Sequence, residues 1–238
     1  MKAARHIFHR AGKAVMEYEM ILPEDKIAIG VSGGKDSMAL LAALAHLRRV
    51  APIDFSLLAI HIGMGWEEDS CGAAIMSDYC RSLDIPFMIE ATDIAKIIFE
   101  VRQETNPCSL CARMRSGALH NTAKREGCNV VALGHHGDDA IESLLMSITQ
   151  EGRVRTFAPV TQLTRKNLRL IRPLILAFES EVIAMVKECH IPIFKTPCPA
   201  SGQTARNRAK EIIDQMEGES PGTRQRMLRS LSKEPRLW

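Results

Sequence analysis

The sequence predicts an α/β fold in which a Rossmann-like parallel sheet is flanked by helices. Two observations lead to this fold class. Short apolar segments rich in β-branched residues alternate along the chain with longer stretches of helical composition, which is typical of parallel strands joined by crossover helices. The most unusual polar segments also lie where strands end, which is where open α/β sheets bind ligands.

The first strand-helix-strand unit is the clearest. Residues 26–31 (KIAIGV) and 55–62 (FSLLAIHI) are predicted as strands, and the Ala- and Leu-rich residues 36–50 between them as a helix. The alternation then continues along the chain. In order, we expect a helix near 71–83, a strand near 86–89, a helix near 113–126, a strand at 129–134, a helix at 138–148, a strand at 168–171 that ends before Pro173, and a helix near 179–189.

Length and composition indicate one main core. The chain has 238 residues, of which 46% are apolar, and can bury a sizeable core without disulfides or metals. We expect a basic N-terminal helix over residues 1–24, the main α/β domain over 25–200, and a basic helical C-terminal extension over 201–238 with a turn at Pro221-Gly222.

No targeting or membrane segment is expected. The apolar runs fall short of the roughly 20 residues of a membrane span, and the basic N-terminus lacks an apolar signal core. A cytoplasmic protein is therefore predicted, one that does not bind membranes. The seven cysteines are then more readily thiols or metal ligands than a disulfide framework.

A formal net charge of +3 is too small to identify a nucleic-acid-binding protein by itself. Lys and Arg gather in three segments, residues 1–13, 153–172 and 206–236. Each segment is either part of an RNA-binding surface or an ordinary solvated face.

Residues 32–37 (SGGKDS) stand between a predicted strand and a predicted helix. Glycines there allow close backbone approach, and the helix N-terminus offers unpaired N–H groups to an anion. The alternative is a glycine turn with a solvated lysine. The spacing is not that of a Walker A loop, which disfavours cleavage at a γ-phosphate.

SGGKDS instead resembles the PP-loop of the ATP pyrophosphatases, which release pyrophosphate and transfer AMP. The resemblance implies that Lys35 neutralises phosphate charge and that Ser32 and Ser37 donate hydrogen bonds. Asp36 would order the loop or a magnesium ion. The expected ATP contacts in this segment are Ser32, Gly33, Gly34, Lys35, Asp36 and Ser37.

Residues 134–139 (GHHGDD) follow the predicted strand at 129–134. The paired carboxylates of Asp138 and Asp139 suit Mg²⁺ bridging phosphates, and alternatively they cap the following helix. The run GHHGDDAIES resembles the second signature of tRNA-thiolating PP-loop enzymes, GHHxDDxxET, with Ser143 in place of threonine. The histidines are packing or acid–base residues. Expected ATP contacts here are Gly134, His135 and Asp139, and the expected catalytic residues of the two motifs are Lys35 and Asp138.

Cys108 and Cys111 form a CxxC pair, which by itself fits a redox pair, half a zinc site or part of a cluster site. Cys198 lies in the proline-rich run TPCPASGQ at 196–203. The remaining cysteines are in helix-like or strand-edge contexts and are predicted as core residues. They are Cys71, Cys80, Cys128 and Cys189.

SGGKDS, CSLCARMR, LGHHGDD, IRPL and CPASGQ stand in the order seen in tRNA 2-thiocytidine synthetases, over residues 18–207. This resemblance implies an adenine nucleotide alpha hydrolase-like fold. It also implies a 4Fe-4S cluster held by Cys108, Cys111 and Cys198, with one iron left open. These thiols would serve as catalytic residues beside Lys35 and Asp138.

The implied reaction uses ATP and magnesium to adenylylate the C2 oxygen of a base, with loss of pyrophosphate, before sulfur displaces AMP. The implied partners are tRNA and a sulfur donor such as a cysteine desulfurase or free sulfide. Arg113 and Arg115, beside the CxxC pair, are expected to line the entrance for RNA. The oligomeric state stays open, with a homodimer as one option.

The resemblance weakens at residues 61–66 (HIGMGW), where relatives usually have an Asn-Leu-Asp run. Trp66 there is either a stacking surface for a base or a packing residue. Alternatives are a PP-loop sulfurtransferase acting on another tRNA base or on a small molecule, and a nucleotide- and cluster-binding redox sensor without turnover. Lysidine synthetases do not need the three cysteines, and thiouridine synthetases with terminal zinc fingers match less well.

Overall fold

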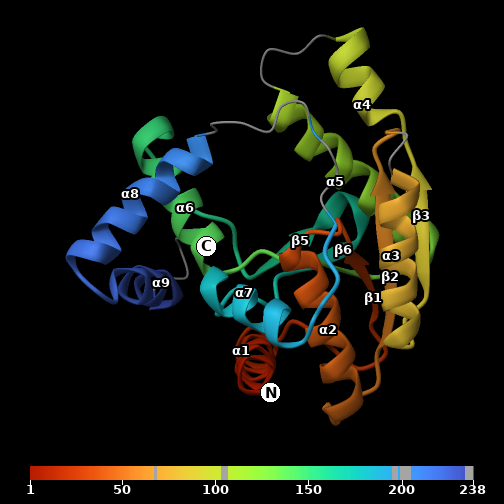
Figure 1. Cartoon of the computed structure of the whole chain (residues 1–238), viewed down its shortest axis with the longest axis horizontal. Helices are drawn as coiled ribbons and strands as arrows, with labels where there is room; N and C mark the ends of the chain where they lie inside the picture. The colour runs from red at the N-terminus through yellow and green to blue at the C-terminus, as the bar shows by residue number, and fades with distance from the viewer. Residues whose placement is uncertain (67–68, 103–106, 195–197, 199–204, 234–237) are drawn as a thin grey trace.

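The computed structural model describes residues 1–66, 69–102, 107–194, 198, 205–233 and 238. Within these residues, the strands form one six-stranded sheet of order β3-β2-β1-β4-β6-β5 (Figure 1). The strands are β1 (Lys26–Gly30), β2 (Ser56–Gly63), β3 (Phe87–Ala91), β4 (Val130–Ala132), β5 (Val160–Leu163) and β6 (Leu168–Ile171). All neighbours pair in parallel except β5, which is antiparallel to β6. This mostly parallel sheet confirms the predicted fold class, although the edge strand β5 was not predicted.

The order of the strands creates a switch point at the centre of the sheet. From β1 the chain moves outward through β2 to β3, and then returns to place β4 on the other side of β1. Loops that leave two such strands diverge and open a crevice beyond their carboxyl ends. The loops after β1 and β4 are residues 31–34 and 133–136, so both polar motifs begin at this crevice.

Helices cover both faces of the sheet, because side chains of the inner strands alternate between two cores. In β1, Ile27 and Ile29 enter one core and Ala28 enters the other. The first core takes side chains from α1 (Lys2–Glu17), α2 (Lys35–Val50), α3 (Asp69–Ser82) and α7 (Glu179–Glu188). The second takes side chains from α4 (Ile94–Lys96), the π-helical turn Ile97–Val101 and α5 (Pro107–Arg125).

The N-terminal helix α1 belongs to the first core. Its buried residues recur at spacings of three and four, so they form one face that packs against α7 and α2. They are Ala4, Ile7, Ala11 and Ala14. The helix ends at Glu17, earlier than the predicted residue 24, and the chain then turns toward β1.

The C-terminal helices α8 (Ala205–Glu219) and α9 (Thr223–Lys233) pack against α6 (Gly137–Met146) rather than against the sheet (Figure 1). Their contact centres on Ile141, Ile213 and Leu228. The turn predicted at Pro221-Gly222 separates them. Within the described residues, no helix is long and apolar enough to cross a membrane.

All helices and strands predicted from the sequence are present, and their bounds differ most at the end of α1 and at the start of α5. This helix begins at Pro107, six residues before the predicted start at residue 113. Proline favours the first position of a helix because its missing N–H would have no partner there. The CxxC pair therefore lies on the first turns of a helix. The short π-helical turns Ile97–Val101 and Ser147–Glu151 and the 3₁₀ turn Thr164–Lys166 were not predicted.

Candidate active site

The phosphate loop, residues 32–37, is held in shape by its own hydrogen bonds. Ser37 Oγ donates to the Gly34 carbonyl at 2.9 Å and accepts from the Ser32 N–H at 3.1 Å. Gly33 has φ +80°, a conformation that other residues rarely adopt. Gly34 caps α2 without a side-chain hydrogen bond, so the first N–H groups of the helix stay open to a ligand. The loop therefore presents an anion-binding helix end.

The loop after β4 lies directly against the phosphate loop. A Cβ on Gly134 would come within 2.8 Å of the Asp36 carbonyl oxygen, so this approach requires glycine. Next to it, His136 Nε2 lies 3.5 Å from Asp36 Oδ1. The two motifs thus meet, as the positions of the strand ends predicted.

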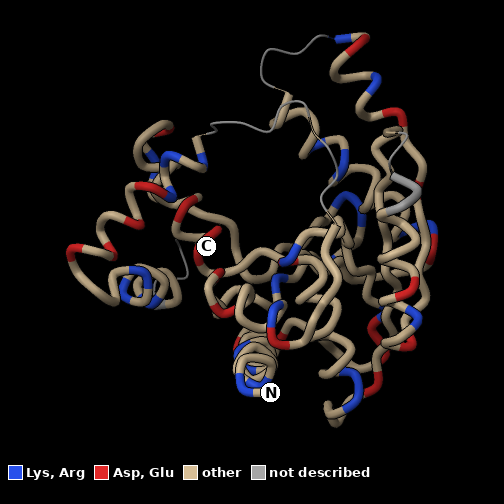
Figure 2. The backbone as a smooth tube through the Cα atoms, in the orientation of Figure 1, with Lys and Arg blue, Asp and Glu red and all other residues tan. Residues whose placement is uncertain are grey.

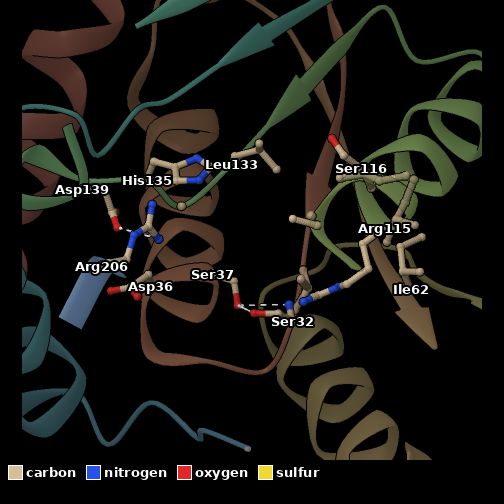
Figure 3. A pocket seen from close by; sticks show the side chains of 16 residues that line it. Ser32, Asp36, Ser37, Ile62, Arg115, Ser116, Leu133, His135, Asp139 and Arg206 are labelled. Atoms are coloured by element: carbon tan, nitrogen blue, oxygen red, sulfur yellow. Dashed lines mark hydrogen bonds and ion pairs between the residues drawn. The ribbon is translucent and has the colours of Figure 1, made fainter. Parts of the chain in front are cut away.

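A cavity of about 520 Å³, which we call the phosphate-loop cavity, lies between these motifs and has the size of a small-molecule site (Figure 3). Its apolar side is formed by Ile60, Ile62, Leu119 and Leu133. Its polar side is formed by Ser32, Asp36, Ser37, His135, Asp139 and Arg206. Sequence reasoning did not single out Arg206, which reaches this cavity from the start of α8.

Lys35 does not line this cavity. Its Nζ lies 2.9 Å from Asp36 Oδ2 and 3.0 Å from Glu179 Oε1 at the start of α7. Burial lowers the pKa of Lys35, but the hydrogen bonds and charges of Asp36 and Glu179 outweigh burial and leave the pKa above its usual value. Glu179 also accepts a hydrogen bond from Lys210 on α8. Burial opposes its ionisation, yet the two lysines bring the pKa of Glu179 down to about 2.

The two adjacent carboxylates of the second motif point to different places. Asp138 accepts hydrogen bonds from the Glu179 N–H and from Arg224 Nε, each at 2.7 Å, and lines a separate cavity beside α7, α8 and α9. Asp139 faces the phosphate-loop cavity and accepts a hydrogen bond from the His136 N–H at 2.9 Å, which completes a capping box. Only Asp139 lines the phosphate-loop cavity, whereas the partners of Asp138 lie far along the chain.

His135 lines the phosphate-loop cavity as a neutral packing residue. Its ring centroid lies 5.1 Å from that of Phe157, and the Arg172 guanidinium lies over the Phe157 ring, 4.8 Å from the ring centroid. Burial, with the nearby Arg172 charge, lowers the pKa of His135 to about 4 even though Asp139 opposes the shift. The imidazole is thus uncharged near neutral pH. Of the two roles left open, this environment favours packing.

Cys108, Cys111 and Cys198 line a second cavity, of about 460 Å³, which we call the cysteine cavity. Its walls include the aromatic rings of Trp66 and Phe99, whose centroids are 5.8 Å apart. Burial raises the pKa of the Cys111 thiol, and the charge of Arg115 partly opposes this. No three His, Cys, Asp or Glu side chains in the part of the chain that the structure describes are already arranged around a single metal position.

The two cavities adjoin. Ser32, Ile62, Ala112 and Arg115 belong to the lining of both. The arginines expected at the RNA entrance differ, since Arg113 is exposed whereas Arg115 is partly buried in this shared wall. Elsewhere, Lys and Arg positions are spread along several elements rather than gathered in one patch (Figure 2).

Phe194 connects the phosphate loop to the chain that leads toward Cys198. Its N–H donates to the Gly33 carbonyl at 2.8 Å. Its ring covers Gly72 of α3, where an added Cβ would come within 2.2 Å of the ring. Phe194 therefore contacts the phosphate loop and α3 and also lines the cysteine cavity. Residues 195–197 and 199–204, which include most of the CPASGQ run, lie outside the described residues.

The remaining cysteines fit the predicted packing role where the structure describes them. Cys80 and Cys128 are buried, and Cys189 is partly buried against the first core. The side chain of Cys71 lies outside the described part.

Comparison with known proteins gives consistent results. The family model described as PP-loop domain matches residues 4–216. A tRNA-cytidine(32) 2-sulfurtransferase of Pelobacter propionicus is 42% identical over 96% of this chain and 85% of its own length. One of Citrifermentans bemidjiense is 36% identical over 97% of this chain and 91% of its own.

Solved structures agree with this fold. The U34-tRNA thiolase NcsA from Methanococcus maripaludis, solved with its 4Fe-4S cluster, aligns with a TM-score of 0.80 at 25% identity, over 97% of this chain and 78% of that one. A phosphoadenylyl-sulfate reductase from Candida auris shares only the fold, with a TM-score of 0.51 at 12% identity. On the evidence of its two motifs, its sheet and these relatives, the chain belongs to the PP-loop domain family and, within it, to the tRNA-cytidine(32) 2-sulfurtransferases.

Proposed function

We propose that this protein uses ATP to replace the C2 oxygen of a cytidine in tRNA with sulfur, as the names of its relatives indicate for them. The C2 oxygen attacks the α-phosphorus of ATP, and pyrophosphate leaves. Sulfide then attacks C2, and AMP leaves with the oxygen. Both bond changes occur at one carbon–oxygen group, so the nucleotide and the sulfur have to reach the same base.

The observation that carries this proposal is the shared wall of the two cavities. One cavity is bounded by the phosphate loop, and the other by Cys108, Cys111 and Cys198. A base at the boundary is in reach of both, whereas separate sites would require an activated base to move through water. Trp66 and Phe99 supply apolar surface on which a base can stack.

ATP would place its phosphates at the start of α2. Ser32 and Ser37 supply hydroxyl groups there, and the helix end supplies N–H groups. We also propose that Lys35 leaves its acidic partners to neutralise phosphate charge when ATP binds. Magnesium fits beside Asp36 and Asp139, because both line the cavity and Asp36 Oδ1 is buried without a hydrogen-bond partner.

An iron–sulfur cluster fits the cysteine cavity by its donor chemistry. Thiolates are the usual cluster ligands, and three thiols line one cavity that has largely apolar neighbours. When bound, a 4Fe-4S cluster with three protein ligands supplies an open iron that can hold sulfide. The protein's own part is to exclude water with Trp66, Phe99 and Phe194 and to keep the base between the two cavities.

The test is anaerobic purification with iron, sulfide and zinc analysis, followed by nucleoside analysis of tRNA incubated with ATP, magnesium and sulfide. We expect iron and sulfide in the protein and 2-thiocytidine in the tRNA. A cysteine desulfurase with cysteine and a thiol reductant, which releases sulfide from the desulfurase persulfide, should replace free sulfide as the donor. A protein that holds zinc alone would contradict the cluster assignment.

The same assay separates the alternatives. A different thiolated nucleoside would identify another tRNA base as the substrate, and AMP formation without tRNA would indicate a small molecule. Cluster binding with no ATP turnover in either case would indicate a redox sensor.

A further inference from the structure

Arg115 occupies the wall between the two cavities. Its side chain lines both of them and, in Figure 3, is directed toward Ser32 of the phosphate loop. On α5 it follows Cys108 by seven residues and Cys111 by four, so all three side chains lie on one face of the helix. The helix that carries two of the thiols therefore also brings a guanidinium to the phosphate loop.

Among the residues that the structure describes, this guanidinium has no acidic partner. Arg115 Nε is buried without a hydrogen-bond partner, and no ion pair to Arg115 occurs among the described residues. A partly buried cation without a counter-charge is costly, so the arrangement favours an anionic ligand. Arg206, on another part of the phosphate-loop cavity, is different, because its nitrogens lie 3.6 Å from Asp139 Oδ1 and 3.5 Å from Glu142 Oε2.

We propose that Arg115 is a catalytic residue that contacts the adenylyl phosphate and stabilises the charge that develops as AMP leaves. This inference rests on the proposed function. In the adenylylated base the phosphate is a diester with one negative charge. Sulfide forms the C2–S bond, the C2–O bond breaks, AMP departs with that oxygen as a dianion, and the proton of the sulfide is released to water.

The position of Arg115 suits this step better than the alternatives. The phosphate of the intermediate joins a base at the boundary of the two cavities to an adenosine in the phosphate-loop cavity, so it lies beside the shared wall. Of the side chains common to both linings, Ile62 and Ala112 are apolar and Ser32 is neutral, which leaves Arg115 as the cation. A planar guanidinium also matches two phosphate oxygens at once.

The first experiment measures binding without turnover. AMP and adenosine are titrated calorimetrically into anaerobically purified wild type, Arg115→Gln and the matched control Arg113→Gln, which changes an exposed arginine two positions away. We expect Arg115→Gln to weaken AMP binding by about 10-fold or more and to leave adenosine binding unchanged. Equal losses for AMP and adenosine, or unchanged AMP binding, would overturn the proposal.

The second experiment measures single-turnover formation of AMP and 2-thiocytidine in tRNA. Arg115→Gln should lower the rate constant by about 10²- to 10³-fold, as for loss of a donor to a developing oxyanion. Arg115→Lys should recover part of this rate constant. In Arg115→Gln, KM for tRNA and the visible absorption of the cluster should stay at wild-type values. A defect confined to KM for tRNA would make Arg115 an RNA contact and refute the catalytic role.

The two readouts also separate this inference from the proposed function. One outcome is that the wild type forms no 2-thiocytidine while Arg115→Gln still weakens the binding of AMP and not that of adenosine. In that case the proposed substrate is wrong and the phosphate contact holds. If the wild type is active and both readouts of Arg115→Gln match it, only the role of Arg115 is refuted.

Discussion

The phosphate-loop cavity and the cysteine cavity are neighbours that are built in different ways. The first takes most of its polar side chains from residues 32–37 and 134–139, whose shape comes from local hydrogen bonds and from two helix starts. The second gathers side chains from β2, the π-helical turn after α4, α5, Phe194 and Cys198. The first is therefore recognisable from short motifs, whereas the second exists only once distant segments have packed. Substitutions should separate the two accordingly.

The largest expected effect is in the cysteine cavity. Cys198→Ala should remove the cluster and bring tRNA thiolation below detection, because it deletes one of three thiols. AMP binding should remain at the wild-type value. The matched control is Cys189→Ala, which changes a partly buried cysteine that does not line the cavity. Iron analysis and nucleoside analysis check both, and a Cys198→Ala protein with full iron and thiolation would show that the ligand set is wrong.

The opposite pattern is expected at the phosphate loop. Lys35→Ala should slow tRNA-dependent pyrophosphate release by about 10²- to 10³-fold while iron content stays unchanged. Lys210→Ala is the control, since it removes the other lysine that pairs with Glu179 and does not belong to the loop. If both variants lose activity equally, the ion pairs of Glu179 matter and Lys35 has no separate role toward ATP.

A pair of glycine substitutions probes how tightly the two motifs meet. Gly134→Ala should cost about 1–3 kcal/mol in the free energy of unfolding, because its Cβ would press on the Asp36 carbonyl. Gly117→Ala, in α5 with nothing within 4 Å of the added Cβ, should instead gain about 0.5–1 kcal/mol. Urea denaturation measures both, and a neutral Gly134→Ala would mean that the loops can separate freely.

The smallest effect concerns Glu142, a buried carboxyl on α6 near Asp139 and Arg206. Burial, with the charge of Asp139, raises the pKa of Glu142 to about 7. The folded state therefore binds this proton more tightly than the unfolded chain, and its contribution to stability is lost as pH rises through about 7.

The free energy of unfolding of the wild type should therefore fall between about pH 5 and pH 8. That of Glu142→Gln should fall by less, and the difference should be on the order of 1 kcal/mol. Glu211→Gln, at an exposed position on α8, should not change the pH profile. Identical profiles for wild type and Glu142→Gln would show that this carboxyl titrates as it does in the unfolded chain.

The sequence predicted the parts of this molecule that depend on local signals. The strands of the central sheet and the loops that follow β1 and β4 were found because apolar runs, glycines and helix starts lie within a few residues of one another. The edge strand β5 was missed because its four residues, three partly exposed and one exposed, carry no clear alternation. It is a strand only because β6 pairs with it.

Long-range contacts account for the other differences. Asp138 looks equivalent to Asp139 in the sequence, but its carboxylate pairs with Arg224, which lies 86 positions further along the chain, and lines a different cavity. Glu179 and Arg206 carry no motif of their own and reach the site through the packing of α7 and α8. The role inferred for Arg115 depends on a wall between two cavities, which no spacing in the sequence reveals.

The hydrogen bond from Phe194 to Gly33 gives the protein a built-in reporter. An amide proton that is bonded to the phosphate loop exchanges with solvent only when that bond opens. A nucleotide that steadies the loop should therefore slow deuterium uptake at Phe194, four residues before Cys198. Binding of ATP at the phosphate loop would then also affect the segment that leads to Cys198. This link would couple activation of the base to the cysteine cavity.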